Sequence, residues 1–376
     1  IQKVRELTGA DTVVAVMNGD FVQRGEPAVA DKYIRTRMAL SEGADMVFEL
    51  PVRFGLSSAE DFAYGGILAL HSLSFVDWFC FGSEGAPMRA LEEAGSFFAE
   101  EPPAYQGRLG EFLREGYSFP AAREKAYAEC TGRAEPALFS PNNILGLEYM
   151  KSAMRLGTAM KPVIVSRQGM GYHETQVRKQ ENRFLSATAI RAKLREGELC
   201  GMPPKALEEF QNAPCYLQPE DFWQLCSYAI RDKWDRLEQV KDISEDMANA
   251  FRKNWYGAVS FEDFVGACKT KNLTMSRIKR CLFQTLLGID KEEEKEKSLP
   301  YIRLLGMKKE AAGYLRRVSG TVVLGRLAKD MGQLGEQAQT KLQQDIRAAD
   351  IYRSVAMSVS GKVTSEEYKR PVIIME

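Results

Sequence analysis

The sequence predicts an α/β protein in which a parallel sheet covered by helices is followed by a mostly helical C-terminal domain. Between residues 12 and 196, short β-branched runs alternate with helical stretches, the pattern of a parallel sheet with crossover helices. After Pro203 and Pro204 the pattern changes to helices that carry large apolar residues. A length of 376 residues, 45% of them hydrophobic, is enough for about two to three cores. We therefore expect one domain over residues 1–200 and another over residues 205–376.

The first domain is expected to alternate strands with helices. The predicted strands are Thr12–Met17, Asp45–Leu50, Phe75–Phe81 and Pro162–Val165. The predicted helices are Asp31–Leu40, Ser58–Leu70, Met88–Ala99, Asn142–Arg155 and Ser186–Glu196. Ser186 is a favourable N-cap for the last of these helices, and Gly197 ends it. Residues 101–140 are rich in Pro, Glu and Ala and are interpreted as an insertion with two short helices.

The second domain is expected to be mainly helical. One buried stripe is predicted from apolar residues at helical spacing: Phe222, Leu225, Cys226 and Ala229. Ser260 and Thr274 are predicted to cap two further helices, the second of which ends at Gly288. Residues 321–324 and 371–374 have the composition of strands, so this domain need not be purely helical.

The composition excludes several classes of protein. The 51 Lys and Arg balance the 51 Asp and Glu, so the whole-chain charge gives no reason to expect a nucleic-acid or membrane partner. The seven cysteines form no C-x-x-C pair and the only histidines are His71 and His173, which leaves no zinc cluster. Scattered cysteines in odd number are typical of reduced thiols in a cytoplasm, and no apolar run reaches the roughly 20 residues that span a bilayer. We expect a cytoplasmic protein.

Ligands of open parallel sheets bind at the carboxyl ends of the strands, so the segments after the predicted strands are the candidate sites. The first strand is followed by Gly19–Ala28, in which Arg24 is a forked donor; a binding loop and an ordinary polar loop fit this segment equally. The third strand breaks at Gly82, where backbone without a side chain can lie against a nucleotide. Asn142 and Asn143 open a helix and either cap it or contact a polar ligand, with capping as the default interpretation.

The strongest chemical feature surrounds the fourth strand. This strand leads to Arg167, and the helix after it starts with Ser186, Thr188 and Arg191. The free N–H groups of a helix N-terminus, hydroxyl groups and a guanidinium all favour a phosphate. Residues 161–195 carry eight basic and two acidic residues, a local charge of +6 in a neutral protein. This concentration predicts a polyanionic ligand.

A second basic cluster surrounds the helix that Thr274 is predicted to cap. Its members are Arg252, Lys253, Lys269, Lys271, Arg277, Lys279 and Arg280. A solvated helix face is the ordinary explanation, but basic clusters on both domains favour RNA over a small nucleotide alone. We therefore expect Arg277, Lys279 and Arg280 to contact RNA.

Five segments carry a resemblance to a known family, in order and spacing over nearly the whole chain. They are Gly19–Ala28, Phe48–Pro51, Phe81–Glu84, Pro141–Gly146 and Ser186–Arg191. Together they resemble the tRNA(Met) cytidine acetate ligase family, which implies a Rossmann-like nucleotidyltransferase domain with an appended, mostly helical RNA-binding region. The resemblance implies a ligase that activates acetate with ATP and acetylates N4 of the wobble cytidine of elongator methionine tRNA, releasing AMP and pyrophosphate. ATP is then a substrate, with Mg²⁺ allowed as its companion ion.

The same resemblance assigns individual residues. Gly82, Asn142 and Arg167 match positions expected to contact ATP. The segment with Ser186, Thr188 and Arg191 corresponds to the second phosphate-binding signature of this class. The tRNA is then the expected partner of the basic residues in the second domain.

The sequence departs from the family in one respect. Family members begin with a strand and a loop of the form Asn-Pro-Phe-His-Asn-Gly-His, whose histidines stabilise charge on the phosphates during adenylation. Nothing in these 376 residues has that spacing, so no catalytic residue is assigned. We expect that an N-terminal segment is missing, that the sheet lacks one central strand, and that the chain as given is nearly inactive.

Two alternatives remain open. A small-molecule nucleotidyltransferase of the same fold would not need residues 205–376 with a basic helix behind the catalytic domain. A non-catalytic RNA-binding protein would not need Arg167 and the start of the Ser186 helix to converge on one sheet edge. The tRNA ligase is the preferred interpretation.

Overall fold

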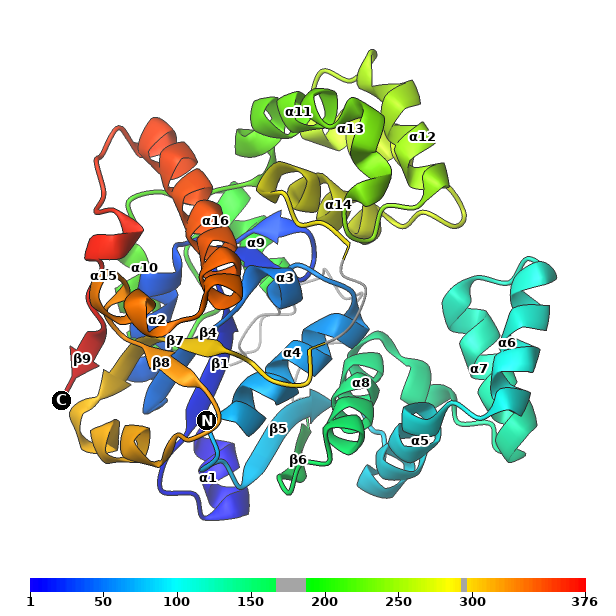
Figure 1. The fold of residues 1–376 in the computed structure, drawn as a ribbon, viewed down its shortest axis with the longest axis horizontal. Coiled ribbons are helices and arrows are strands. Elements are labelled where there is room, and N and C mark those ends of the chain that lie inside the picture. Colours follow the sequence, from blue (N-terminus) through cyan, green and yellow to red (C-terminus); the bar gives the residue numbers. More distant parts are fainter. Residues whose placement is uncertain (167–186, 292–295) are drawn as a thin grey trace.

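The computed structural model describes residues 1–166, 187–291 and 296–376, and its main sheet is mixed rather than purely parallel (Figure 1). The strands of this sheet are β1 (Val14–Asn18), β4 (Met46–Leu50), β7 (Tyr301–Lys308), β8 (Val322–Leu324) and β9 (Ile373–Met375). The first three strands lie in the order β1-β4-β7. Both β8 and β9 are parallel to β7: β8 pairs with residues 301–303 and β9 with residues 306–308. Strands β1 and β4 are parallel, and β4 and β7 are antiparallel. The α/β class is confirmed, and the predicted parallel sheet is extended by an antiparallel strand that was not predicted.

Helices cover both faces of this sheet. Helix α2 (Lys32–Ser41) packs on the face of Val47 and Leu305, and helix α4 (Ala59–Ser72) on the face of Phe48. Both helices begin with a side-chain cap at the predicted start: the Asp31 carboxylate accepts a hydrogen bond from the Ile34 N–H, and the Ser58 hydroxyl accepts one from the Asp61 N–H. Alternate side chains of β4 therefore point to opposite faces of the sheet and pack against two separate layers of helices.

A second, two-stranded sheet lies beside the first. Strands β5 (Trp78–Ser83) and β6 (Lys161–Ser166) are parallel. Helices α5 (Met88–Glu100) and α8 (Pro141–Leu156) pack next to them, and the insertion forms α6 (Pro103–Arg114), α7 (Phe119–Thr131) and the 3₁₀ turn η1 (Pro136–Phe139). In Figure 1 the hairpin of α6 and α7 stands away from the sheets, at the right.

The edge strand β1 of the main sheet and the edge strand β5 of the second sheet line a common cavity of about 580 Å³. Residues 14–16 of β1 and residues 75–80 around the start of β5 line it, together with Val4 and Thr8 of α1 (Gln2–Thr8) and with Tyr149. Within the described part of the chain, β1 is hydrogen-bonded only to β4, and β5 only to β6. A strand placed in this cavity would join the two sheets.

The helical unit stands above the sheet in Figure 1. Its helices are α11 (Trp223–Asp232), α12 (Glu245–Trp255), α13 (Phe261–Cys268) and α14 (Met275–Leu287), preceded by α9 (Ala187–Arg195) and α10 (Pro204–Gln211). Ser260 and Thr274 accept hydrogen bonds from the Asp263 and Arg277 N–H groups, so both predicted caps are confirmed. The predicted stripe is buried at three of its positions, whereas Leu225 is 36% exposed because α11 turns that position toward solvent.

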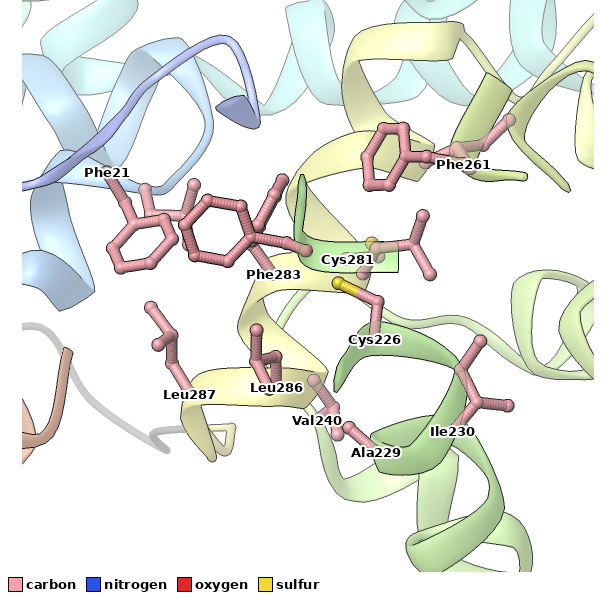
Figure 2. Packing of buried hydrophobic residues seen from close by; sticks show 14 of the residues in the cluster. Phe21, Cys226, Ala229, Ile230, Val240, Phe261, Cys281, Phe283, Leu286 and Leu287 are labelled. Atoms are coloured by element: carbon pink, nitrogen blue, oxygen red, sulfur yellow. The ribbon is translucent and has the colours of Figure 1, made fainter. Parts of the chain in front are cut away.

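A short hairpin joins the sheet to the helical unit. It consists of β2 (Phe21–Val22) and β3 (Glu26–Pro27), within the segment that follows β1. Phe21 is fully buried, and its ring lies beside that of Phe283 (Figure 2). The ring centroid of Phe21 is 5.3 Å from that of Phe283 and 5.7 Å from that of Phe222. Gly25 has φ +74°, and a Cβ there would collide with the backbone of α14 at Lys279 and Arg280. The segment Gly19–Ala28 is therefore largely a joint between two parts of the molecule.

The C-terminal residues return to the first sheet. After the turn α15 (Leu327–Asp330), the long helix α16 (Glu336–Ser360) lies against the joint, where the Tyr352 hydroxyl donates to the Ala28 carbonyl at 2.8 Å. The short helix α3 (Val52–Gly55) is tied to α16 because the Val52 N–H donates to the Asp345 carboxylate at 2.7 Å. Residues 205–376, expected as one domain, thus contribute both the helical unit and three strands of the sheet.

Candidate functional site

The carboxyl ends of β5 and β6 form the edge at which the sequence predicted a nucleotide. The parallel register pairs Gly82 with Val165 and Ser83 with Ser166, so both strands end at the same level. Gly82 is exposed there. Arg167 directly follows Ser166 in the chain, and both Arg167 and Ser186 lie outside the described residues.

The first turn of α8 is bound to the end of β5 by one side chain, Asn143. Its Oδ1 accepts hydrogen bonds from the Ser83 hydroxyl at 2.7 Å and from the Glu84 N–H at 2.9 Å. Its Nδ2 donates to the Glu84 carbonyl at 3.0 Å and to the Ala137 carbonyl at 2.8 Å. Asn142, predicted to contact ATP, precedes it in the same turn. The structure therefore brings Gly82 and the α8 start together.

The predicted phosphate segment is described from Ala187 onward. Thr188 and Arg191 belong to α9, and the Arg191 Nε lies 3.9 Å from a carboxylate oxygen of Glu26 in β3. This ion pair places α9 beside the joint. Glu26 also pairs with Lys279 of α14 at 3.3 Å, so one carboxylate connects α9, the hairpin and the helical unit.

The basic residues predicted to contact RNA differ in how far the surrounding protein encloses their side chains. Arg277 donates to the Asp242 carbonyl at 3.1 Å. The Lys279 side chain is only 12% exposed, between Glu26 and Glu262. Burial lowers the pKa of Arg280, whose buried Nε has no hydrogen-bond partner among the described residues. The β2–β3 hairpin packs on this part of α14, which is why these charges are more enclosed than helical periodicity alone indicates.

Beneath the joint lies a buried charge network that sequence reasoning missed. The Lys32 ammonium, on a side chain that is 1% exposed, is 2.9 Å from Glu49 and also contacts Glu367 of the 3₁₀ turn η6 (Glu367–Lys369). Arg303 of β7 contacts Glu367 as well and lies 3.5 Å from Glu49. Gly19 is required next to this network because a Cβ there would collide with the Glu49 carboxylate.

The surroundings in this network shift the pKa values of Asp20 and Glu367 in opposite directions. Burial raises the pKa of Asp20 to about 7, although Lys32 opposes that shift. Burial would also raise the pKa of Glu367, but Lys32 and Arg303 outweigh it and lower the value to about 2. The sequence signals for this network are Gly19-Asp20 after the first strand and Glu49 within Phe48–Pro51, whereas Arg303 and Glu367 lie more than 250 positions away.

The described residues show no other obvious chemistry. Among them, no group of three or more His, Cys, Asp and Glu side chains is arranged to hold a metal ion. All seven cysteines are free thiols. Over the ranges that the structure describes, no helix is both long and apolar enough to cross a membrane. The nucleotide predicted for the strand ends of β5 and β6 and the start of α8 stays a prediction.

Comparison with known proteins adds names to this geometry. A family model described as HIGH Nucleotidyl Transferase matches residues 1–367. The tRNA(Met) cytidine acetate ligase of Caldicellulosiruptor saccharolyticus is 36% identical over 359 residues, covering 94% of this chain and 88% of the relative. The enzyme of the same name from Thermoanaerobacter pseudethanolicus is 36% identical over 364 residues, covering 94% of this chain and 90% of the relative.

Solved structures give the same picture. The apo crystal structure (form I) of Thermotoga maritima TmcAL matches with a TM-score of 0.91 and 30% sequence identity, covering 100% of this chain and 95% of that one. The crystal structure of the same protein bound with α-thio ATP (form II) matches with a TM-score of 0.89 and 30% identity, covering 99% and 94%.

Proposed function

Because this chain belongs to the tRNA(Met) cytidine acetate ligase family, we propose that it is an ATP-dependent ligase that acetylates N4 of the wobble cytidine of elongator methionine tRNA. The observation that carries the proposal is the 36% identity to ligases of that name over 94% of the chain. The TM-score of 0.89 to a structure bound with α-thio ATP supports ATP as a substrate.

The reaction has two steps. A carboxylate oxygen of acetate attacks the α-phosphorus of ATP, the bond to the β-phosphate oxygen breaks, and pyrophosphate leaves. The exocyclic amine of the cytidine then attacks the acetyl carbonyl carbon, loses one proton, and displaces AMP to form the amide. Acetate alone is a poor acyl donor, and the adenylate supplies the leaving group that makes the second step feasible. The first step requires positive groups on the phosphates, where negative charge develops.

We propose that Gly82, Asn142 and Arg167 contact ATP. The register of β5 and β6 and the attachment of the α8 start to β5 support a common location for Gly82 and Asn142. Thr188 and Arg191, with Ser186 at the start of the same segment, are proposed to stabilise the phosphates, since hydroxyls, a guanidinium and a helix N-terminus all favour anions.

We propose that the helical unit binds the tRNA, with Arg277, Lys279 and Arg280 of α14 among its contacts, and that the protein acts in the cytoplasm. A tRNA substrate is supported by the names of the relatives. The helical unit packs on the β2–β3 hairpin, so α14 lies directly against the segment that follows β1.

The direct experiment is transfer of radiolabelled acetate into tRNA in the presence of ATP and magnesium. We expect the 376-residue chain by itself to be nearly inactive, because its two histidines, His71 and His173, are not paired in spacing and cannot supply the phosphate-stabilising loop. The same chain preceded by a strand and a paired-histidine loop is expected to label methionine tRNA and to release AMP and pyrophosphate.

Two results would contradict the proposal. The first is label from acetate that stays out of the tRNA in the extended protein while ATP is present. The second is label that enters from acetyl-coenzyme A without ATP, since that route needs no adenylate. A tRNA with uridine at the wobble position is the matched control and should take up no label.

A further inference from the structure

We propose that Asn143 is a positioning residue for ATP: it fixes the end of β5 against the start of α8, and the affinity for ATP depends on this attachment. The inference rests on the proposed contacts of Gly82 and Asn142 with ATP and goes beyond them, because Asn143 touches the protein rather than the nucleotide.

The hydrogen bonding of Asn143 is complete. A carboxamide has two N–H donors and an oxygen that accepts two bonds. Both donors are used, on the Glu84 and Ala137 carbonyls, and both acceptor positions are used, by Ser83 and the Glu84 N–H. The residue is fully buried. A buried group with every bond satisfied is expensive to replace, because each lost partner leaves a buried polar atom without a hydrogen bond.

The amide takes the place of a neighbouring strand. The ladder between β5 and β6 ends at Ser83 and Ser166. At the next residue, Glu84, Asn143 bonds both the N–H and the C=O, as the peptide group of an adjacent strand would do. Strand β5 is therefore held for one residue beyond its ladder, two residues after Gly82.

The attachment links three parts of the proposed ATP site. The end of β5 carries Gly82, the first turn of α8 carries Asn142, and η1 contributes the Ala137 carbonyl. Because the protein already holds the three parts together, ATP binding does not have to order them, and its affinity is higher for that reason. The helical unit takes no part in these bonds, so tRNA binding should be independent of them.

The decisive variant is Asn143→Asp. The substitution keeps size and the Oδ1 acceptor, but it places an oxygen opposite the Glu84 and Ala137 carbonyl oxygens, at the position that donates to them now. We expect ATP to bind at least about tenfold more weakly at pH 8, because two hydrogen bonds become repulsive contacts. The affinity for tRNA should stay within about twofold of the original protein, since α14 is not attached to this turn.

The same variant has a pH signature. Burial raises the pKa of a carboxyl group, and the protonated group has an O–H that can donate to one of the two carbonyls. ATP affinity of Asn143→Asp should therefore recover as the pH falls from about 8 to about 6. The unsubstituted protein, titrated over the same range, corrects for protonation of ATP itself.

Two further variants complete the design. Ser152→Ala removes another buried hydrogen bond in α8, from the Ser152 hydroxyl to the Glu148 carbonyl at 2.7 Å, and should leave ATP affinity unchanged. Ser83→Ala removes one bond to Asn143 with little risk to folding and should weaken ATP binding by a smaller factor. It carries the test if Asn143→Asp does not fold. Thermal unfolding of each variant is measured alongside calorimetric titration with ATP and filter binding of tRNA.

The outcomes separate the two proposals. Weaker ATP binding with unchanged tRNA binding and recovery at low pH supports the positioning role. Equal ATP affinity in folded Asn143→Asp and in the original protein overturns it, as does a parallel loss of ATP and tRNA binding without recovery at low pH. If the original protein itself binds no ATP, the proposed nucleotide site fails, and the inference fails with it.

Discussion

Asp20 is a buried carboxyl group whose proton affinity makes the fold sensitive to neutral pH. Burial raises its pKa from 3.8 to about 7. An acid with a raised pKa in the folded state gives stability that is complete below its unfolded pKa and is lost as the pH rises through the folded value. We therefore expect the free energy of unfolding to fall between about pH 4 and pH 7 through this residue and to level off above that. Glu367, with a pKa of about 2, stays ionised over that window.

Asp20→Asn tests this expectation. The amide keeps the oxygen that accepts the Lys32 N–H at 2.9 Å and cannot ionise. Urea unfolding at pH 4, 5, 6 and 7 should show the variant gaining stability over the original protein as the pH rises. Parallel pH profiles for the two proteins would show that Asp20 does not titrate in this range.

Gly25 is the other residue at the joint whose position is strict: only glycine fits there. Its φ of +74° and the backbone of α14 leave no room for a Cβ. Gly25→Ala is expected to lower the free energy of unfolding by about 1–3 kcal/mol or more. Gly110→Ala is the matched control, because Gly110 lies inside α6 and a Cβ added there would meet nothing within 4 Å. Alanine at that position should stabilise the protein by about 0.5–1 kcal/mol. Equal stability changes in the two variants would contradict the close packing at the joint.

Single residues also show where sequence reasoning ends. Ser260 and Thr274 were predicted as caps and are caps, because a cap is a bond over three positions of the chain. Asn143 was predicted to cap a helix or contact a ligand, yet its side chain bonds to residues 83 and 84. No local pattern distinguishes these roles, because its partners lie 59 and 60 positions away.

At the scale of elements, β7 is the clearest example of a missed strand. Arg303 lies in the middle of Tyr301–Lys308, which breaks the apolar run that would indicate a buried strand. It is tolerated because Glu49 of β4 and Glu367 compensate its charge. The predicted strand β1 starts with four apolar residues, and in β4 the charged Glu49 comes only after Met46, Val47 and Phe48. The sequence did not indicate β7 because the acidic partners of Arg303 lie far away in the chain.

Helix α14 carries the prediction for tRNA at this scale. Arg277 is the proposed contact least enclosed by acidic partners, since Lys279 faces two carboxylates and Arg280 is largely buried. Arg277→Gln is expected to weaken tRNA binding a few-fold and to reduce the slope of log affinity against log salt by about one unit. ATP binding should not change.

Lys329→Gln is the control for that experiment. It removes the same charge from an exposed residue of α15, outside the helical unit. If both variants lose the same affinity for tRNA, the effect is one of total charge, and α14 is not the contact surface.

At the scale of the whole molecule, the sheet is completed by the end of the chain. Strand β4 pairs with β7, and β7 with β9, so segments near residues 50, 300 and 375 form one layer. The sequence predicted the class, the alternation of strands and helices, and the helical unit, since each depends on short-range periodicity. It did not predict that β7, β8 and β9 join the first sheet, because strand order depends on contacts between distant segments.

The cavity between β1 and β5 has a consequence for how the chain behaves in solution. A strand edge without a partner exposes a row of amide and carbonyl groups that can template the addition of another strand, from a peptide or from a neighbouring molecule. Among the described strands, two such edges face each other across one space, so a guest strand would gain hydrogen bonds on both sides at once. Over the described residues, the edges of β1 and β5 therefore have the properties of a receptor for a complementing strand, and filling it is expected to lower the tendency of the protein to self-associate.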